Sequence, residues 1–398
     1  MRTVGTTVRG IRCPIIREGD NLEDIVVGSV LNAAKDNNFE LNDKDVIAVT
    51  ESVVARAQGN YATVKQIAVD VKNKFGADST IGVIFPILSR NRFAICLKGI
   101  ARAAKKIILM LQYPTDEVGN ALIDLKTFQN TTIKPYWDAL TLEDYRKLFG
   151  NYIHQFTGID YVDYYKNIIE EQGAECEIIF SNHAKYILSF TNKVIICSIH
   201  SRFSTKKYLE EDKFENIILT LDDIMNNSIN GSGYNEDYGL LGSNKASEDK
   251  VKLFPRDCQS FVNNIQQKII AKTGKNIEVM IYGDGAFKDP QGKIWELADP
   301  VVSPGYTSGL EGTPNEVKIK YLADNDFSNY NGEELQEKII KSIEEKDKNL
   351  KGKMISEGTT PRKITDLLGS LCDLTSGSGD KGTPIILIQG YFDNYSVN

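Results

Sequence analysis

The chain has 398 residues, which is too long for one ordinary core, so about two or three domains are expected. Its hydrophobic content of 41% and charged content of 25% are ordinary for a soluble globular protein, and no apolar run is long enough for a membrane span. The net charge of −7 argues against a main role in binding nucleic acid, because phosphate backbones attract basic surfaces.

Cysteine and histidine usage argues against a zinc or thiol redox site. The six cysteines form no Cys-x-x-Cys pair, and there are only three histidines. A bound metal is therefore expected to have oxygen ligands. The start of the chain lacks the apolar stretch of a secretory signal, so the expected compartment is the cytoplasm, with reduced cysteines.

The first 75 residues alternate between strand-like and helix-like patterns. The expected elements are a strand at 4–16, a helix from about Asn21 after an N-cap pattern at Asp20, a buried strand at 46–49, a strand-to-loop segment at 51–59 and a helix at 64–75. The next stretch predicts a strand at 81–85, a basic helix at 93–105 and a strand at 107–111. This order predicts an α/β fold.

The composition changes after residue 113, where tyrosine becomes frequent. Strands are predicted at 175–180, 186–190 and 194–197, among helices. We therefore expect an inserted α/β subdomain at 114–226 that interrupts a core made of residues 1–113 and 227–398.

The second part of the core begins with a loop at 226–242 that is rich in Asn, Gly, Ser and Tyr. The elements expected after it are a helix at 255–273, a strand at 277–281, a charged helix at 331–350, a helix with Pro361 in its first turn that runs to about 374, a small-residue loop at 375–382 and a buried strand at 384–388.

Two of these segments carry candidate chemistry. Asp284 stands between two glycines after an apolar strand, where a carboxylate can hold Mg²⁺ or Mn²⁺ beside a phosphate; a plain Asp-Gly turn is the alternative. The loop at 376–381 can cradle phosphates with its backbone N–H groups, or serve as a flexible connector. It lacks the spacing of a P-loop.

Four segments taken in order resemble one family, the coenzyme F420-0:L-glutamate ligases. They are Gly10-Ile-Arg-Cys-Pro-Ile-Ile-Arg-Glu-Gly-Asp-Asn-Leu22, Asp45-Val-Ile-Ala-Val-Thr-Glu-Ser-Val-Val-Ala-Arg-Ala-Gln-Gly59, the stretch from Tyr238-Gly-Leu-Leu-Gly-Ser-Asn-Lys through Leu253-Phe-Pro-Arg-Asp257 to Asp284, and the C-terminal stretch from Asp366 to Gly390. The second is similar to the most specific family segment. The resemblance covers roughly residues 1–75 and 230–390.

The resemblance implies a ligase-like core with mixed sheets and an enzyme that forms an amide bond. Such an enzyme adds L-glutamate through a γ-glutamyl linkage to a cofactor-like carboxylate acceptor, with GTP as co-substrate and Mg²⁺ or Mn²⁺ as the metal. The carboxylate is activated as an acyl phosphate and then attacked by the amine of glutamate. A homodimer is a further expectation from the resemblance.

The resemblance also assigns residues by position. The catalytic positions are Asp284, Arg56 and Lys288. The metal positions are Asp284, Gly285, Glu248 or Asp249, and Ser378. The nucleotide positions are Pro14, Ile15, Ile16, Arg17, Glu51, Ser52, Arg56, Ser376, Gly377, Ser378, Gly379, Asp380 and Lys381.

Several positions depart from the family pattern. Gly285 stands where the family has a hydroxyl residue, Ser378 stands near a usual carboxylate, Arg56 replaces a lysine, and Lys288 is the candidate for a missing arginine. Residues 76–230 have no counterpart in shorter members. Two alternatives therefore stay open: the same chemistry on a folate-like or other acceptor, and a non-catalytic nucleotide-binding homologue.

Overall fold

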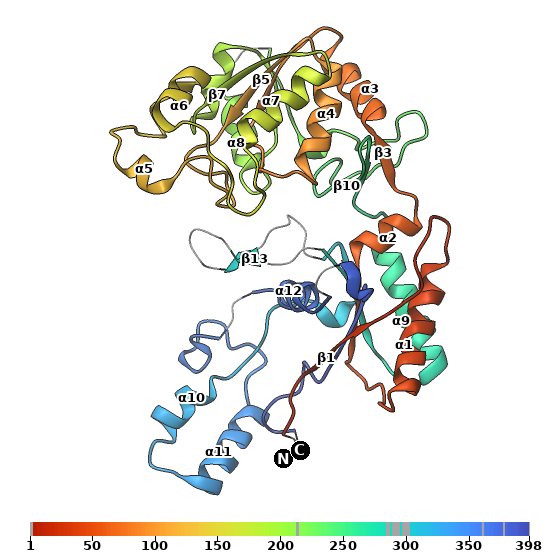
Figure 1. Cartoon of the computed structure of the whole chain (residues 1–398). Helices are drawn as coiled ribbons and strands as arrows, with labels where there is room; N and C mark the ends of the chain where they lie inside the picture. Colours follow the sequence, from red (N-terminus) through yellow and green to blue (C-terminus); the bar gives the residue numbers. More distant parts are fainter. Residues whose placement is uncertain are drawn as a thin grey trace.

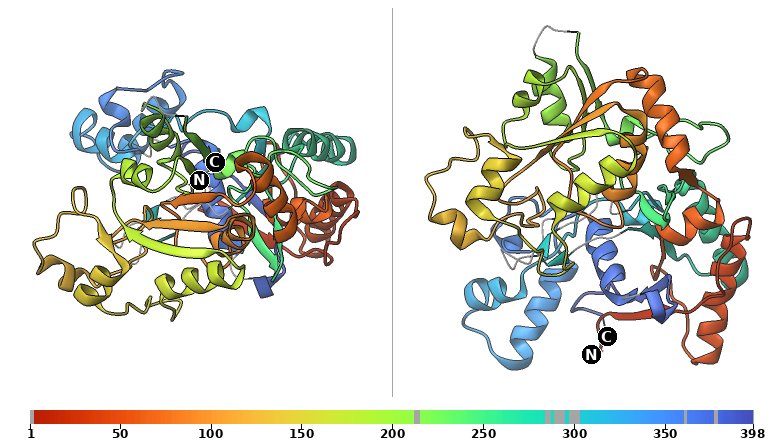
Figure 2. Two further views of the ribbon diagram at one scale, coloured as in Figure 1. Left: turned by 90° about the horizontal axis from the view of Figure 1, so that it is seen from above. Right: turned by 45° about the horizontal axis from the view of Figure 1, so that its top comes forward.

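The computed structural model describes residues 3–211, 215–283, 303–359, 362–376 and 379–397, together with the backbone of two short strands at 287–288 and 295–296. Its fold is α/β, and Figure 1 shows two separate sheet-containing parts, one above the other, each with its own helices. The N and C termini lie close together in Figures 1 and 2 because the first and last strands are hydrogen-bonded neighbours.

One part is built on a mixed five-stranded sheet. Its strands, in spatial order, are β1 (Thr7–Ile11), β16 (Ile385–Gln389), β2 (Val46–Thr50), β12 (Glu278–Tyr282) and β15 (Gly305–Tyr306). Only β2 and β12 pair in parallel, and the other neighbours are antiparallel. The sheet therefore joins segments from both ends of the chain.

The alternating side chains of β2 show how this sheet is covered on both faces. Ile47 and Val49 pack with the helices α1 (Leu22–Asp36) and α9 (Cys258–Thr273). Val46 and Ala48 point to the opposite face and pack with α12 (Ile364–Ser376). Since successive side chains of a strand point to opposite faces, one short apolar run supplies both cores.

The other part is built on a six-stranded sheet. Its spatial order is β6 (Leu140–Thr141), β7 (Glu175–Phe180), β5 (Lys106–Leu111), β4 (Thr80–Ile84), β8 (Lys193–Ile196) and β9 (Ile217–Thr220). All neighbours pair in parallel except β6, which is antiparallel to β7. The first strand of this sheet in the chain, β4, thus lies in its middle.

Helices cover both faces of the six-stranded sheet. The helices α3 (Val64–Phe75), α4 (Phe93–Ala103) and α7 (Tyr161–Glu171) share the larger core with one face. The short helix η1 (Ala184–Ser189) and α8 (Arg202–Glu210) share the core of the other face. The remaining elements near this sheet are α5 (Leu125–Gln129), α6 (Leu142–Phe149) and η2 (Leu221–Asp223).

A small antiparallel sheet of β10 (Asn244–Ser247), β11 (Lys250–Lys252) and β3 (Tyr61–Thr63) lies where the chain passes between the two parts. The helix α2 (Glu51–Ala57) links β2 to β3. The other elements are β13 (Phe287–Lys288), β14 (Trp295–Glu296), η3 (Ser308–Leu310), α10 (Ile319–Tyr321), η4 (Leu322–Asp326), α11 (Gly332–Glu344), η5 (Met354–Ser356) and η6 (Gly379–Lys381).

Strand pairing crosses the expected domain boundary between residues 113 and 114. This boundary falls after β5, yet β5 pairs in parallel with β7, which follows it in the chain. We therefore propose that the second unit spans about 64–252 rather than 114–226, an interval that contains every strand of the six-stranded sheet. An apolar run predicts a buried strand but does not say which sheet will contain it.

Most predicted elements are confirmed, and two are wrong. Residues 51–59 were expected as a strand leading into a loop, but Glu51–Ala57 is the helix α2. The second is the strand expected at 186–190, where residues 186–189 belong to the short helix η1. Ile187 packs against the face of the sheet, and the edge of β4 on this side is already hydrogen-bonded to β8, so this segment adds no strand. None of the helices in the described ranges is both long and apolar enough to cross a bilayer.

The loop after β5 contains the buried Asp116, whose carboxylate accepts hydrogen bonds from the backbone of Leu88, Val118 and Asn120. Burial raises the pKa of Asp116 from 3.8 to about 6. Between these pH values the native state keeps a proton that the unfolded chain has released. The free energy of unfolding should therefore fall by about 2 kcal/mol as the pH rises from about 4 to about 6.

The variant Asp116→Asn cannot titrate at this position, so its free energy of unfolding should lack this part of the slope. Urea unfolding of both proteins between about pH 4 and pH 7 measures the difference. Parallel curves for the two proteins would contradict the expectation.

Candidate functional site

A cavity of about 370 Å³ lies where four distant segments meet, and we call it the β2–α12 cavity. Its described lining residues are Cys13, Pro14, Ile15, Ile16, Thr50, Val53, Arg56, Tyr282, Asp373, Ser376, Gly379, Gly382, Thr383 and Pro384. They come from the segment after β1, the junction of β2 with α2, the end of β12, and the turn between α12 and β16. The volume lies within the usual range for small-molecule sites.

Secondary structure explains which side chains reach this cavity. On α2, Val53 and Arg56 are three residues apart, so they share one face of the helix. On α12, Asp373 and Ser376 have the same spacing at the C-terminal end. The backbone N–H of Thr50 donates to the carbonyl of Pro384 at 3.0 Å, which fixes the β2–α2 junction against the start of β16.

The described lining carries one cation, Arg56, and one carboxylate, Asp373. Arg56 is exposed, so its five donors can approach an anion in the cavity. Tyr282 is buried, and burial raises the pKa of its hydroxyl, which is therefore neutral near pH 7. The hydroxyls of Thr50 on β2, Ser376 on α12 and Thr383 in the turn before β16 add further oxygen atoms.

The structure brings together six of the thirteen residues that the sequence assigned to the nucleotide. Those that line the cavity are Pro14, Ile15, Ile16, Arg56, Ser376 and Gly379. Asp380 and Lys381 are exposed residues of η6, directly after Gly379. These segments are separated by more than 300 positions in the chain, so their convergence is a consequence of the sheet order β1-β16-β2-β12.

Three other predicted nucleotide residues do not line the cavity. Arg17 and Ser52 are exposed, and the backbone N–H of Arg17 donates to Asp20 at 2.6 Å. Glu51 is buried, and its carboxylate pairs with the ammonium group of Lys252 on β11 at 2.9 Å. Glu51 therefore fixes the start of α2, the helix that carries Arg56.

Of the predicted metal ligands, only Glu248 and Asp249 belong to the described residues. Glu248 is exposed at the turn between β10 and β11, where it pairs with Lys245 and, at 3.7 Å, with Lys98. Asp249 is exposed beside it, and its backbone carbonyl accepts from Val64. In the described ranges no group of three His, Cys, Asp or Glu side chains is placed to hold a metal.

The other assigned residues fall where the structure gives no account of them. Asp284, Gly285, Gly377 and Ser378 lie outside the described residues, and Lys288 is described only as part of the backbone of β13. Their roles as metal, catalytic or nucleotide residues stay predictions. Tyr282, two positions before Asp284, does line the β2–α12 cavity.

Sequence reasoning missed four polar residues of this cavity: Thr50, Tyr282, Asp373 and Thr383. Helical spacing could have revealed Asp373, which lies three residues before the predicted Ser376 on the same helix. Thr50 and Tyr282 are the last residues of the parallel neighbours β2 and β12, where a parallel pair presents its C-terminal edge.

Comparison with known proteins identifies the family of this chain. A model of the family described as F420-0:Gamma-glutamyl ligase matches residues 10–390, nearly the whole chain. No curated protein matches the chain at a significant level. The chain therefore belongs to the F420-0:gamma-glutamyl ligase family, and it is a ligase that forms a carbon–nitrogen bond.

Proposed function

We propose that this ligase uses GTP and Mg²⁺ or Mn²⁺ to attach L-glutamate, through its amine, to a carboxylate acceptor, and that the β2–α12 cavity binds the nucleotide. The observation that carries this proposal is the meeting of Pro14–Ile16, Arg56, Ser376 and Gly379 in one cavity. The cavity combines a cation, a turn of small residues and an apolar wall. Triphosphate and base need these three features.

Arg56 and the turn after α12 would bind the phosphates. The guanidinium group can donate two parallel hydrogen bonds to a phosphate, so it both neutralises charge and fixes orientation. Gly379 and Gly382 line the cavity without side chains, which lets phosphate oxygens approach the backbone N–H groups of the turn. Ser376 and Thr383 would add hydroxyl donors.

The residues present fit a hard divalent cation. Asp373 supplies a carboxylate, and the hydroxyls of Thr50, Ser376 and Thr383 supply further oxygens. Mg²⁺ commonly binds through one or two carboxylates together with substrate phosphates and waters. When bound, such an ion neutralises the charge that develops on the transferring phosphoryl group.

The reaction has two balanced steps. An oxygen of the acceptor carboxylate attacks the γ-phosphorus of GTP, the bond to the β-phosphate oxygen breaks, and GDP leaves. The neutral amine of glutamate then attacks the acyl carbon, inorganic phosphate leaves with the bonding pair, and the amine releases one proton. Arg56 would stabilise negative charge on the phosphoryl group in the first step.

Incubation with GTP, Mg²⁺ or Mn²⁺, L-glutamate and F420-0 tests this function. We expect equimolar GDP and a product heavier by one glutamyl residue in mass spectra. Without glutamate, hydroxylamine should trap the acyl phosphate as a hydroxamate. A glutamyl product without GTP consumption, or GTP-dependent product without any hydroxamate, would contradict the proposed route.

The identity of the carboxylate acceptor is tested separately from the reaction. Because the six-stranded unit adds a large surface beside the core, a folate-like or other carboxylate is the second candidate. GDP formation that depends on glutamate and on such a compound, but not on F420-0, would support it. GTP binding with no turnover for any acceptor would favour a non-catalytic role.

Ile15 offers a test of how the base is held, because this large apolar side chain is 82% exposed and yet lines the cavity. The variant Ile15→Ser should weaken GTP binding by about tenfold, since roughly 1.4 kcal/mol of apolar contact with the ligand is lost. Stability should not change. Binding of inorganic tripolyphosphate should also stay unchanged, and calorimetry measures both ligands. Equal loss for tripolyphosphate would place Ile15 at the phosphates.

A further inference from the structure

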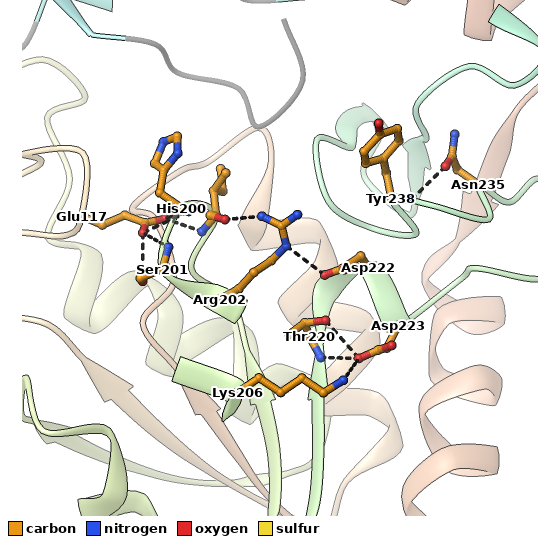
Figure 3. A network of polar contacts seen from close by, with 11 residues as sticks. Glu117, His200, Ser201, Arg202, Lys206, Thr220, Asp222, Asp223, Asn235 and Tyr238 are labelled. Atoms are coloured by element: carbon orange, nitrogen blue, oxygen red, sulfur yellow. Dashed lines mark hydrogen bonds and ion pairs between the residues drawn. The ribbon is translucent and has the colours of Figure 1, made fainter. Parts of the chain in front are cut away.

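Six buried side-chain atoms have no hydrogen-bond partner among the described residues. Two of them, Arg202 Nε and Asp222 Oδ1, lie 3.3 Å apart and form an ion pair, which Figure 3 shows at the start of α8. The other four atoms are Gln112 Oε1, Ser198 Oγ, Asn216 Nδ2 and Tyr282 Oη. Buried polar atoms are usually satisfied by protein, water or ligand, so each of these four needs an explanation.

Tyr282 differs from the other three residues because it lines the β2–α12 cavity. Gln112, Ser198 and Asn216 lie next to strands of the six-stranded sheet and do not line this cavity. Tyr282 is the last residue of β12 and is only 2% exposed. A buried hydroxyl without a partner, in the wall of a proposed ligand site, indicates that the ligand supplies the missing partner.

Three other buried tyrosines show how the protein treats a phenol that serves packing alone. Tyr113, Tyr145 and Tyr165 are buried to a similar extent as Tyr282. Each donates its hydroxyl to a backbone carbonyl oxygen, which belongs to Asp138, Leu122 and Ile87 respectively. The fold therefore gives these hydroxyls a partner, whereas Tyr282 has none in the described ranges.

The hydroxyl end of Tyr282 lies at the wall of the cavity. The side chain belongs to the apolar core between the five-stranded sheet and α12. Burial has the largest effect on the raised pKa of its hydroxyl, and neighbours with smaller effects include Ser376, Asp373 and Thr50. These three residues all line the cavity, so the hydroxyl is on the cavity side. Neither Ser376 nor Thr50 meets the geometry of a hydrogen bond with it.

The neighbours of this hydroxyl indicate which part of the nucleotide it meets. Ser376 is the last residue of α12, directly before the turn proposed to bind phosphates. Thr50 is the register partner of Tyr282 on β2, and α2, which carries Arg56, starts at the next residue. The hydroxyl is therefore close to both elements that are proposed to hold the phosphates. A phenol can donate one hydrogen bond, and ionised phosphate oxygens accept.

We propose that the Tyr282 hydroxyl donates a hydrogen bond to a phosphate oxygen of bound GTP. This inference rests on the proposed binding of GTP in the β2–α12 cavity, and it adds a direct ligand contact from β12. In the free protein the buried hydroxyl carries a desolvation cost, which the phosphate oxygen offsets on binding. Tyr282 therefore strengthens nucleotide binding at the expense of the stability of the fold.

The variant Tyr282→Phe tests the contact because it keeps the ring and removes only the hydroxyl. In the presence of Mg²⁺, its affinity for GTP should fall by at least about tenfold, since a hydrogen bond to a charged group is lost. Affinity for inorganic tripolyphosphate should fall by the same factor. The melting temperature should stay the same or rise, because the free protein loses no hydrogen bond. Calorimetric titration and thermal unfolding measure the two effects.

Thr307→Val is the matched control, because it removes a buried hydroxyl that does have partners in the same part of the molecule. The hydroxyl of Thr307 donates to the carboxylate of Glu278 and accepts from the backbone N–H of Val279. Thr307 does not line the cavity. This variant should show the opposite pattern, with a lower melting temperature and unchanged affinity for GTP.

Two results for Tyr282→Phe would overturn the inference: a lower melting temperature, which shows a structural partner for the hydroxyl, and a loss of affinity for GTP but not for tripolyphosphate, which moves the contact to the base. Unchanged affinity in Tyr282→Phe, with the expected loss in Arg56→Gln, would reject the role of Tyr282 and leave the proposed function standing. A wild-type protein that binds neither GTP nor tripolyphosphate would reject both the nucleotide site and the contact.

Discussion

The variant Lys252→Met should lower the free energy of unfolding by about 3–5 kcal/mol. Lys252 and Glu51 are both buried, and their ammonium and carboxylate groups lie 2.9 Å apart. Methionine keeps most of the side-chain volume but removes the cation, so the buried Glu51 carboxylate loses its ion pair with Lys252. Urea unfolding followed by circular dichroism measures the loss.

A double variant separates the charge effect from packing. Glu51→Gln combined with Lys252→Met removes both charges and should recover most of the lost stability, because an uncharged pair needs no compensation. The exposed residue Glu248 provides the control, and Glu248→Gln should leave the unfolding curve unchanged within error. A double variant as unstable as the single variant would show that packing, not charge, dominates.

The variant Arg56→Gln should weaken GTP binding by roughly 100-fold, because charge-assisted hydrogen bonds to a phosphate contribute about 1.5–3 kcal/mol each. Arg56 is exposed and lines the β2–α12 cavity, so the folded state should be unaffected. Calorimetric titration of GTP in the presence of Mg²⁺ measures the affinity. Inorganic tripolyphosphate should lose affinity to the same extent.

Arg102→Gln is the matched control for this experiment. Arg102 lies on the basic helix α4, and its Nε donates to Gln172 at 3.0 Å. Its replacement should leave GTP affinity unchanged. A larger loss for Arg102→Gln than for Arg56→Gln would move the nucleotide site to α4 and would contradict the proposed function.

Much of the fold follows from local pattern. The apolar runs predicted β2, β5 and β16, and helical periodicity predicted α3 to the residue. The helix α2 was missed because Val53 and Val54 are β-branched and favour a strand locally. Its state is decided by contacts that a local pattern does not contain: the burial of Val54 and the ion pair of Glu51 with β11.

Part of the candidate site was also predictable from the sequence. Pro14, Arg56 and Ser376 were found through resemblance of their segments, and the sheet places them together. Glu248 was assigned through an ambiguous spacing, and the turn between β10 and β11 places it beside Lys98, on the six-stranded side of the molecule. The spacing of residues along the chain does not reveal on which side of the molecule a hairpin places its turn.

The small sheet has a consequence for how this chain acquired its size. Because β3 and β11 are antiparallel neighbours, the chain leaves for the six-stranded unit and returns from it at adjacent points, with Val64 N donating to Asp249 O at 2.9 Å. Adjacent ends allow a whole module to be spliced into a host without stretching it. The same geometry makes the unit a cassette that could be grafted between relatives of different length.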